Sequence, residues 1–168
     1  MSLTSHNRAL SYDDVLLVPQ YSDIRSRTEV DVGTDLGNGL VLNLPVLASP
    51  MDTISETAMA VSLGRLGGAA IIHRYNSAEN QCRMVSIACD IAKTKYNMSI
   101  NIGAAVGISG DAVERATALI DAGTTFLCVD VAHGHHILMK EAITKIRQAV
   151  GDGVHIMAGN VATLEGIN

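Results

Sequence analysis

Short apolar segments alternate with helix-like segments along most of this chain, and this alternation limits the possible folds more than any other feature. Runs such as GAAIIH and FLCVD are almost wholly hydrophobic, as expected for strands that are covered on both faces. The segments between the runs carry apolar residues at helical spacing, and Ser77 precedes one of them as a good N-cap. Strands separated by helices predict a parallel sheet with helical crossovers, an α/β fold. The predicted strands are 44–50, 68–73, 98–107, 126–130 and 154–160, and the predicted helices are 53–67, 77–95, 109–121 and 136–150, with a further helix beginning at Thr163.

Polar or glycine residues gather at the end of each predicted strand. In parallel sheets, ligands bind at the carboxyl ends of the strands, so this distribution predicts one site built from several loops. The turn after the first strand reads SPMDT rather than the glycine-rich GxGxxG of a dinucleotide-binding open sheet. A (β/α) barrel of the TIM type is therefore favoured over a dinucleotide-binding open sheet, with about five strands in this chain. The residues at the strand ends are Ser49 and Asp52, His73, Gly103 and Gly107, Asp130 and His133, and Gly159 and Asn160.

About forty residues of a different character come before the first predicted strand. Apolar positions alternate with polar ones around 15–18 and 30–32, and turn residues lie between these two stretches. We expect short antiparallel strands or an extended arm that caps one end of the barrel. The predicted organisation is an arm over 1–40 and a partial barrel over 41–168. Only about 25 residues separate His73 from the third strand, so no inserted regulatory domain of the CBS type is expected there.

Composition and charge exclude several classes of function. The 168 residues suit a single domain, and their mean hydropathy of +0.25 is high for a soluble protein. No apolar run reaches the roughly 18 to 20 residues that span a bilayer, so a soluble, cytoplasmic protein without a membrane partner is expected. A net charge of -5 argues against nucleic-acid binding. Three cysteines, Cys82, Cys89 and Cys128, without a CxxC pair, argue against a disulfide framework and a zinc cluster.

Three histidines follow Asp130 in the stretch FLCVDVAHGHH, which raises the question of a metal site. His133, His135 and His136 lie near the expected start of a helix, where residues two apart point in different directions. A helical metal pair needs a spacing of four residues. We therefore expect no metal site here, and the simplest interpretation of His135 and His136 is that they are surface residues of the first turn.

Six motifs together resemble the IMP dehydrogenase / GMP reductase family. In chain order they read LSYDDVLLVPQYSDIRSR, LASPMDTISE, GGAAIIHRYNS, NIGAAVG, VDVAHGHH and IMAGNVAT, and they cover the chain from about Leu10 to Glu165. The resemblance implies a (β/α)8 barrel that binds a purine nucleotide monophosphate and a nicotinamide cofactor, NAD or NADP, and that usually assembles as a homotetramer. A monovalent cation is possible in full-length members, although no site for it is visible in this sequence.

The resemblance implies substrate-binding roles for four residues. Ser49 and Met51 match positions that touch the nucleotide, the hydroxyl toward the ribose-phosphate and the thioether against the base. Without the resemblance, Met51 would more simply be a core residue. Asn160 matches an amide near the nucleotide and the reacting ring, and Gly159 allows close approach of the backbone.

Cofactor-binding roles are implied for three further residues. Asp130 matches the acidic residue that accepts hydrogen bonds from a ribose of the nicotinamide cofactor, a role that suits one carboxylate and two hydroxyls. His73 resembles a residue that lines the cofactor side, and the alternative of a hydrogen-bonded, half-buried histidine is about equally supported. Gly103 and the neighbouring GAAVG resemble a loop beneath the cofactor.

The family's chemistry implies a cysteine nucleophile in a loop after the sixth strand, which is expected beyond Asn168. None of the three cysteines stands in that motif, so we expect the chain alone to be inactive, as a truncated half. The favoured reaction of the whole protein is that of IMP dehydrogenase, IMP to XMP with NAD, because SPMDT and INIGAAVG resemble the dehydrogenase. GMP reductase, GMP to IMP with NADPH, is the alternative suggested by IRSRTEVDV. An alternative of another class is a non-catalytic half-barrel that self-associates or partners a full-length subunit.

Overall fold

The computed structural model describes residues 10–167, and the chain divides into two units between Asp31 and Val32. In the first unit, residues 10–31 are mostly extended and carry two 3-10 turns, η1 (Tyr12–Asp14) and η2 (Arg27–Glu29). Of the two expected forms, antiparallel strands are not found around 15–18 and 30–32, and the extended form is present, while the capping of a barrel end stays a prediction. Val15 and Val18 are 44% and 76% exposed and therefore have no buried face that would fix a strand register. The predicted division at residue 40 stays a prediction.

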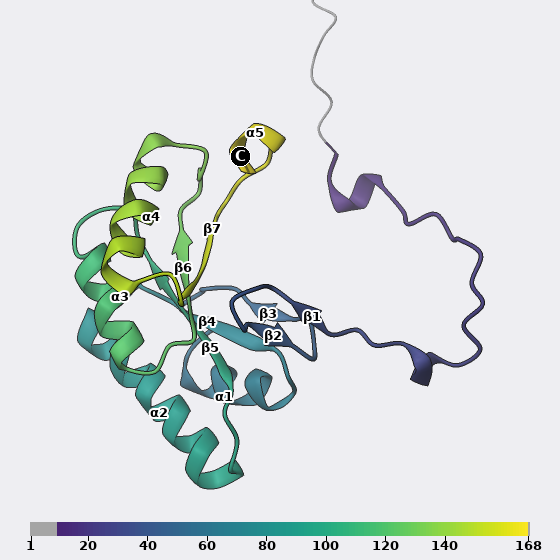
Figure 1. Cartoon of the computed structure of the whole chain (residues 1–168), viewed down its shortest axis with the longest axis horizontal. Coiled ribbons are helices and arrows are strands. Elements are labelled where there is room, and N and C mark those ends of the chain that lie inside the picture. The colour runs from purple at the N-terminus through teal and green to yellow at the C-terminus, as the bar shows by residue number, and fades with distance from the viewer. Residues whose placement is uncertain (1–9, 168) are drawn as a thin grey trace, which may run out of the picture. The chain divides into compact units, whose positions relative to one another are not determined.

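Five parallel strands form the sheet of the second unit, in the order in which they occur in the chain (Figure 1). Within residues 10–167, each of these strands pairs only with its neighbours in the chain, and the order does not reverse as it does in a doubly wound sheet. The curled sheet of successive β-α units confirms the prediction of part of a (β/α) barrel. The strands are β3 (Leu47–Ala48), β4 (Ala69–Ile72), β5 (Asn101–Val106), β6 (Phe126–Asp130) and β7 (His155–Gly159).

The helices occupy the predicted segments, although α1 begins four residues and α3 three residues later than predicted. Ser77 begins the helix after β4, where its side chain accepts a hydrogen bond from the Asn80 N–H over 3.1 Å. The helix after β6 begins one residue later than predicted, since His136 is its N-cap. Figure 1 shows the long helices along one face of the sheet. Their bounds are α1 (Thr57–Arg65), α2 (Ala78–Tyr96), α3 (Ala112–Asp121), α4 (Ile137–Val150) and the short α5 (Leu164–Ile167).

The first barrel strand is much shorter than predicted, and the third is also shorter, with six residues against the predicted 98–107. The mostly apolar run 44–50 yields two strand residues, Leu47 and Ala48. Pro45 and Pro50 flank these residues and lack the N–H groups that a ladder needs. In addition, β3 is an edge strand with β4 as its one neighbour among the described residues, so fewer ladder bonds can extend it.

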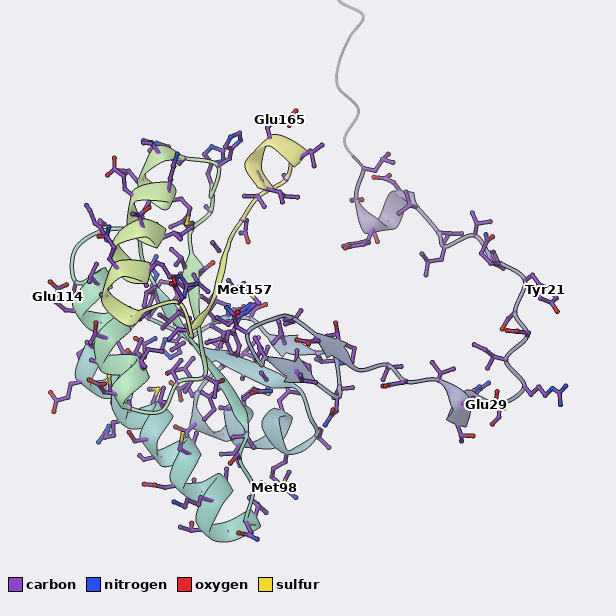
Figure 2. The ribbon with its side chains drawn as sticks, in the orientation of Figure 1. Tyr21, Glu29, Met98, Glu114, Met157 and Glu165 are labelled. Atoms are coloured by element: carbon purple, nitrogen blue, oxygen red, sulfur yellow. The ribbon has the colours of Figure 1, made fainter. Side chains whose placement is uncertain are left out.

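Two apolar clusters cover the two faces of the sheet. The larger cluster fills the space between the sheet and the helices, with fully buried residues such as Ile72, Ile102 and Leu119. On the other face, Phe126 packs with residues of a β-hairpin made of β1 (Thr34–Asp35) and β2 (Val41–Leu42), and Met157, labelled in Figure 2, packs against them. This second cluster is the interior of the partial barrel.

The hairpin also closes one end of the barrel interior. The side-chain amide of Asn101, the first residue of β5, donates to the Val41 carbonyl oxygen over 2.8 Å. Leu40 and Leu42 are 3% and 1% exposed and pack beside Ala69, the first residue of β4. The hairpin therefore covers the amino ends of the strands and leaves their carboxyl ends free. No helix within residues 10–167 combines the length and hydropathy that crossing a bilayer requires.

Candidate functional site

A pocket of about 530 Å³ opens at the carboxyl ends of the strands, and we call it the rim pocket. It contains four of the residues to which the sequence assigned binding roles: Ser49, Met51, Asp130 and Asn160. They come from the loops or ends of β3, β6 and β7, which are far apart in the chain. The predicted convergence of these residues on one site is therefore present, while their binding roles stay predictions. The remaining lining residues are Pro50, Asp52 and Tyr75.

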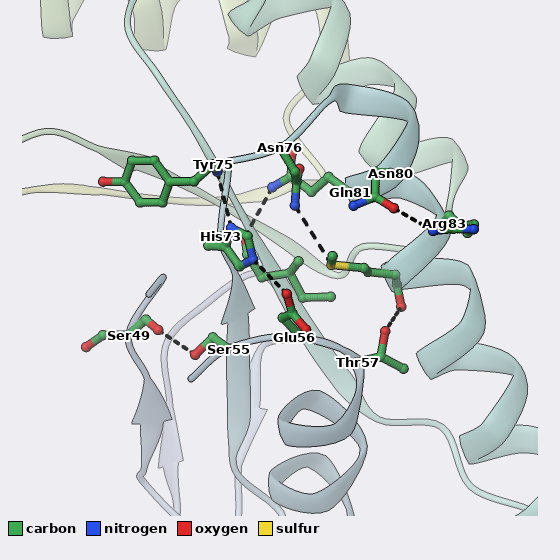
Figure 3. Close-up of polar contacts among 12 residues, drawn as sticks. Ser49, Ser55, Glu56, Thr57, His73, Tyr75, Asn76, Asn80, Gln81 and Arg83 are labelled. Carbon is green, nitrogen blue, oxygen red and sulfur yellow. Dashed lines mark hydrogen bonds and ion pairs between the residues drawn. The ribbon is translucent and has the colours of Figure 1, made fainter. Parts of the chain in front are cut away.

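Ser55 holds the loop that carries Ser49 and Met51. Its side chain is fully buried, and its hydroxyl donates to the Ser49 carbonyl oxygen (Figure 3). Its backbone N–H donates to the Met51 carbonyl oxygen over 2.8 Å, and its own carbonyl oxygen accepts from the His73 N–H. Met51 itself is 48% exposed among the described residues, and its role stays a prediction. The hydrogen bonds of Ser55 therefore fix the backbone of the SPMDT loop, most of whose residues line the rim pocket.

Backbone hydrogen bonds join the loop after β6 to the end of β7. The Val131 N–H donates to the Gly159 carbonyl oxygen over 3.0 Å, and the Asn160 N–H donates back to the Val131 carbonyl oxygen over 2.7 Å. The Gly134 N–H then donates to the Asn160 carbonyl oxygen over 2.7 Å. A Cβ on Gly134 would lie 2.8 Å from that oxygen, so only glycine permits this approach. These bonds hold Asp130 and Asn160 at a fixed separation.

His73 lies beneath the rim, and its side chain is not part of the pocket lining. It is 3% exposed, and its Nε2 donates to Glu56 Oε1 over 3.2 Å (Figure 3). Its Nδ1 accepts from the Tyr75 N–H over 3.2 Å. Both nitrogens are occupied within the protein, which favours the alternative of a hydrogen-bonded structural histidine. The contact with a cofactor stays a prediction.

Gly103 lies inside strand β5 and not in a loop, so the expected loop placement is wrong. It pairs with Ile71 on one side and Phe126 on the other. A Cβ at this position would collide with the Phe126 ring, which crosses the glycine on the interior face of the sheet. Packing of the barrel interior therefore explains this glycine. Its predicted cofactor role is not tested by this placement.

A buried polar network beneath the rim was not anticipated from the sequence. The Gln81 amide is fully buried and donates to the carbonyl oxygens of Ile72 and Ala105, over 3.1 and 2.9 Å. The Gln81 Oε1 accepts from Arg115 Nη1 over 2.9 Å, and the same guanidinium forms an ion pair with Asp111 at 2.8 Å. The network therefore fastens the ends of β4 and β5 to helices α2 and α3. The sequence alone does not indicate whether a glutamine in the first turn of a helix faces the sheet or the solvent.

None of the three cysteines lines the rim pocket. Cys82 and Cys89 lie on α2, and burial raises the pKa of both thiols. Burial and the nearby Asp130 carboxylate raise the pKa of Cys128, inside β6, to about 11. All three are therefore mostly protonated at neutral pH and are poor nucleophiles.

The three histidines after Asp130 do not gather around a common point. His136 uses its Nδ1 to accept the Leu138 N–H over 3.1 Å, as the N-cap of α4. The rings of His133 and His135 lie 6.5 Å apart at an angle of 52°. Among the described residues, no group of three or more His, Cys, Asp or Glu side chains is arranged to hold a metal ion.

Comparison with known proteins gives consistent similarities over nearly the whole chain. The model of the family described as "IMP dehydrogenase / GMP reductase domain" matches residues 9–168. An inosine-5'-monophosphate dehydrogenase of Cryptosporidium parvum is 30% identical over 201 aligned residues, covering 98% of this chain and 49% of that protein. A GMP reductase of Streptococcus agalactiae is 30% identical, covering 93% and 45% respectively. A GMP reductase of Leishmania major is 25% identical, covering 98% and 59%. The chain thus spans about half the length of the curated relatives it matches.

Proposed function

Because the chain belongs to the IMP dehydrogenase / GMP reductase family, we propose that its rim pocket binds a purine nucleotide monophosphate and a nicotinamide cofactor for hydride transfer. The observation that carries this proposal is the convergence of Ser49, Met51, Asp130 and Asn160 on one pocket at the carboxyl ends of the strands. Ligands of (β/α) barrels bind at this end, and the amino ends are already closed by the hairpin.

Each side chain offers chemistry that suits its proposed partner. The Ser49 hydroxyl can donate to the ribose-phosphate of the nucleotide, and the exposed Met51 thioether can lie against the base. The Asp130 carboxylate has two oxygens for the two hydroxyls of a cofactor ribose. The Asn160 amide can both donate and accept near the reacting ring. The cofactor supplies the hydride chemistry, and these residues bind and orient the two rings.

The reaction that we favour is oxidation of IMP to XMP with NAD, and the second candidate is reduction of GMP to IMP with NADPH. SPMDT and INIGAAVG resemble the dehydrogenase, whereas IRSRTEVDV resembles the reductase. The relatives carry both names. No cysteine of this sequence lies at the rim pocket, so the chain alone is expected to bind ligands without turning them over. Assembly into a homo-oligomer belongs to the same proposal.

Binding measurements on the full chain test the proposed roles separately. Titration calorimetry with IMP, GMP, NAD and NADP gives the affinity for each ligand. Asp130→Asn is expected to weaken cofactor binding about tenfold or more and leave nucleotide binding within about twofold, because one charge-assisted acceptor is lost. Ser49→Ala is expected to do the reverse. Asp152→Asn is the matched control, since Asp152 is exposed and precedes β7 at the other end of the strand. Failure of all four ligands to bind would refute the proposal.

A non-catalytic half-barrel remains the second candidate function because of the sheet edges. In the described part of the chain, β3 and β7 each pair on one side only. Open edges invite association with another chain. A mass measurement in solution distinguishes the cases, because self-association predicts a species heavier than the 17.7 kDa monomer. A monomer that unfolds cooperatively would contradict this candidate.

A further inference from the structure

Tyr75 brings an aromatic ring to the rim pocket, and none of the roles proposed above uses it. The residue follows β4 and lines the pocket together with Ser49, Met51, Asp130 and others. Its side chain is 64% exposed, although tyrosine usually buries much of its ring. An exposed aromatic face beside polar side chains is the arrangement that planar bases prefer in many nucleotide sites.

A hydrogen bond to the buried His73 ring fixes the backbone of Tyr75. Its N–H donates to Nδ1 of His73 over 3.2 Å, and His73 in turn donates from Nε2 to Glu56 over 3.2 Å. The two rings are nearly parallel, at 20°, with centroids 6.2 Å apart, so they overlap only at an offset. Figure 3 shows the Tyr75 ring projecting away from His73. The buried His73, paired with the half-exposed Glu56, therefore orients the loop and leaves most of the tyrosine ring uncovered.

We propose that Tyr75 stacks against the base of a nucleotide bound in the rim pocket and is a specificity-determining residue of the site. This inference rests on the proposed function and adds a base-recognition surface to it. Asp130 and Ser49 offer partners for hydroxyl and phosphate groups in the same pocket, and Tyr75 supplies the flat apolar surface that a nucleoside also needs. The base can come from the purine nucleotide or from the nicotinamide cofactor.

Replacing Tyr75 measures the stacking contribution directly. Tyr75→Ala is expected to weaken binding of the stacked nucleotide about 5- to 150-fold, which corresponds to the loss of about 1–3 kcal/mol of base stacking. Tyr75→Phe keeps the ring and is expected to stay within about twofold. Both variants keep the backbone N–H that bonds to His73, so a purely structural role would predict equal affinities for the two variants.

A tryptophan at position 75, followed by fluorescence, identifies which base stacks on this residue. The chain contains no tryptophan, so Tyr75→Trp introduces a single indole whose emission reports on its own surroundings. Quenching by IMP or GMP assigns the stack to the purine nucleotide, and quenching by nicotinamide mononucleotide, which has no purine, assigns it to the nicotinamide end of the cofactor. Tyr96→Trp is the control, because Tyr96 ends α2 about 28 Å along the helix from its start at the rim.

The outcomes separate this inference from the function on which it rests. Quenching at position 75 but not at 96, with weaker binding by Tyr75→Ala, supports the stack. If calorimetry shows nucleotide binding that Asp130→Asn or Ser49→Ala weakens, and the Tyr75 variants are unchanged, the stack is refuted and the proposed function stands. If the full chain binds none of the nucleotides in calorimetry, both are refuted.

Discussion

Gln81 fastens two strand ends to helix α3, and replacement by methionine tests how much stability this network provides. The glutamine is fully buried and makes three hydrogen bonds, to the carbonyl oxygens of Ile72 and Ala105 and from the guanidinium of Arg115. Methionine has a similar length and volume, so Gln81→Met removes all three bonds without creating a large cavity.

The expected loss of stability in Gln81→Met follows from the type of each hydrogen bond that is removed. A neutral hydrogen bond contributes about 1 kcal/mol, and a bond to a charged group about 1.5–3 kcal/mol. Arg115 keeps its bond to the Asn76 carbonyl oxygen and its ion pair with Asp111, so no buried charge is left without a partner. We therefore expect the free energy of unfolding to fall by about 3–5 kcal/mol.

Urea unfolding followed by far-UV circular dichroism measures this change. The matched control is Gln148→Met, because Gln148 lies exposed on α4 and its replacement is expected to change stability by less than about 0.5 kcal/mol. A loss of under about 1 kcal/mol for Gln81→Met, with an unchanged dependence on urea concentration, would show that the network contributes little and that our reasoning is wrong.

Three further predictions concern packing, capping and titration. Gly103→Ala is expected to destabilise the chain by about 1–3 kcal/mol through collision with the Phe126 ring, whereas Gly153→Ala, with open space around it, changes urea unfolding little. Ser77→Ala removes the α2 cap and is expected to cost about 1 kcal/mol in thermal unfolding. The pKa of Cys128 is raised from 9.0 to about 11, so its stabilising contribution is complete below pH 9 and is lost as the pH rises toward 11. Cys128→Ala should therefore show a shallower loss of stability over that range, and an identical pH profile would contradict the assignment.

Much of the second unit follows from local patterns in the sequence. Ser77 and the apolar spacing after it predict α2, and the buried run FLCVD predicts β6 with its bounds. These elements are predictable because every residue in them agrees with the same periodicity. The strand over 44–50 is shorter than its hydropathy indicates, because prolines limit its hydrogen bonding.

The site is only partly predictable, for a physical reason. Asp130 and Asn160 could be placed at strand ends from the sequence, since parallel strands carry their ends to one edge. Gln81 and Tyr75 could not, because whether a first-turn glutamine faces the sheet, or a loop tyrosine faces the pocket, depends on tertiary packing. The resemblance implied a loop at Gly103, whereas the apolar run 98–107 predicted a strand, and the structure has a strand in which the glycine makes room for an aromatic ring from the next strand.

The bonds between the loop after β6 and the end of β7 make one wall of the rim pocket rigid. Val131, Gly134, Gly159 and Asn160 are joined through their backbones, so no change of side-chain rotamer can alter the spacing between the Asp130 and Asn160 backbones. If the pocket binds nucleotides as proposed, ligands of different size are accommodated by movement on the opposite wall, where single side chains project. Substitutions in the loops after β3 and β4 would then change which nucleotides bind. The distance between the Asp130 and Asn160 backbones on the β6–β7 wall would stay the same.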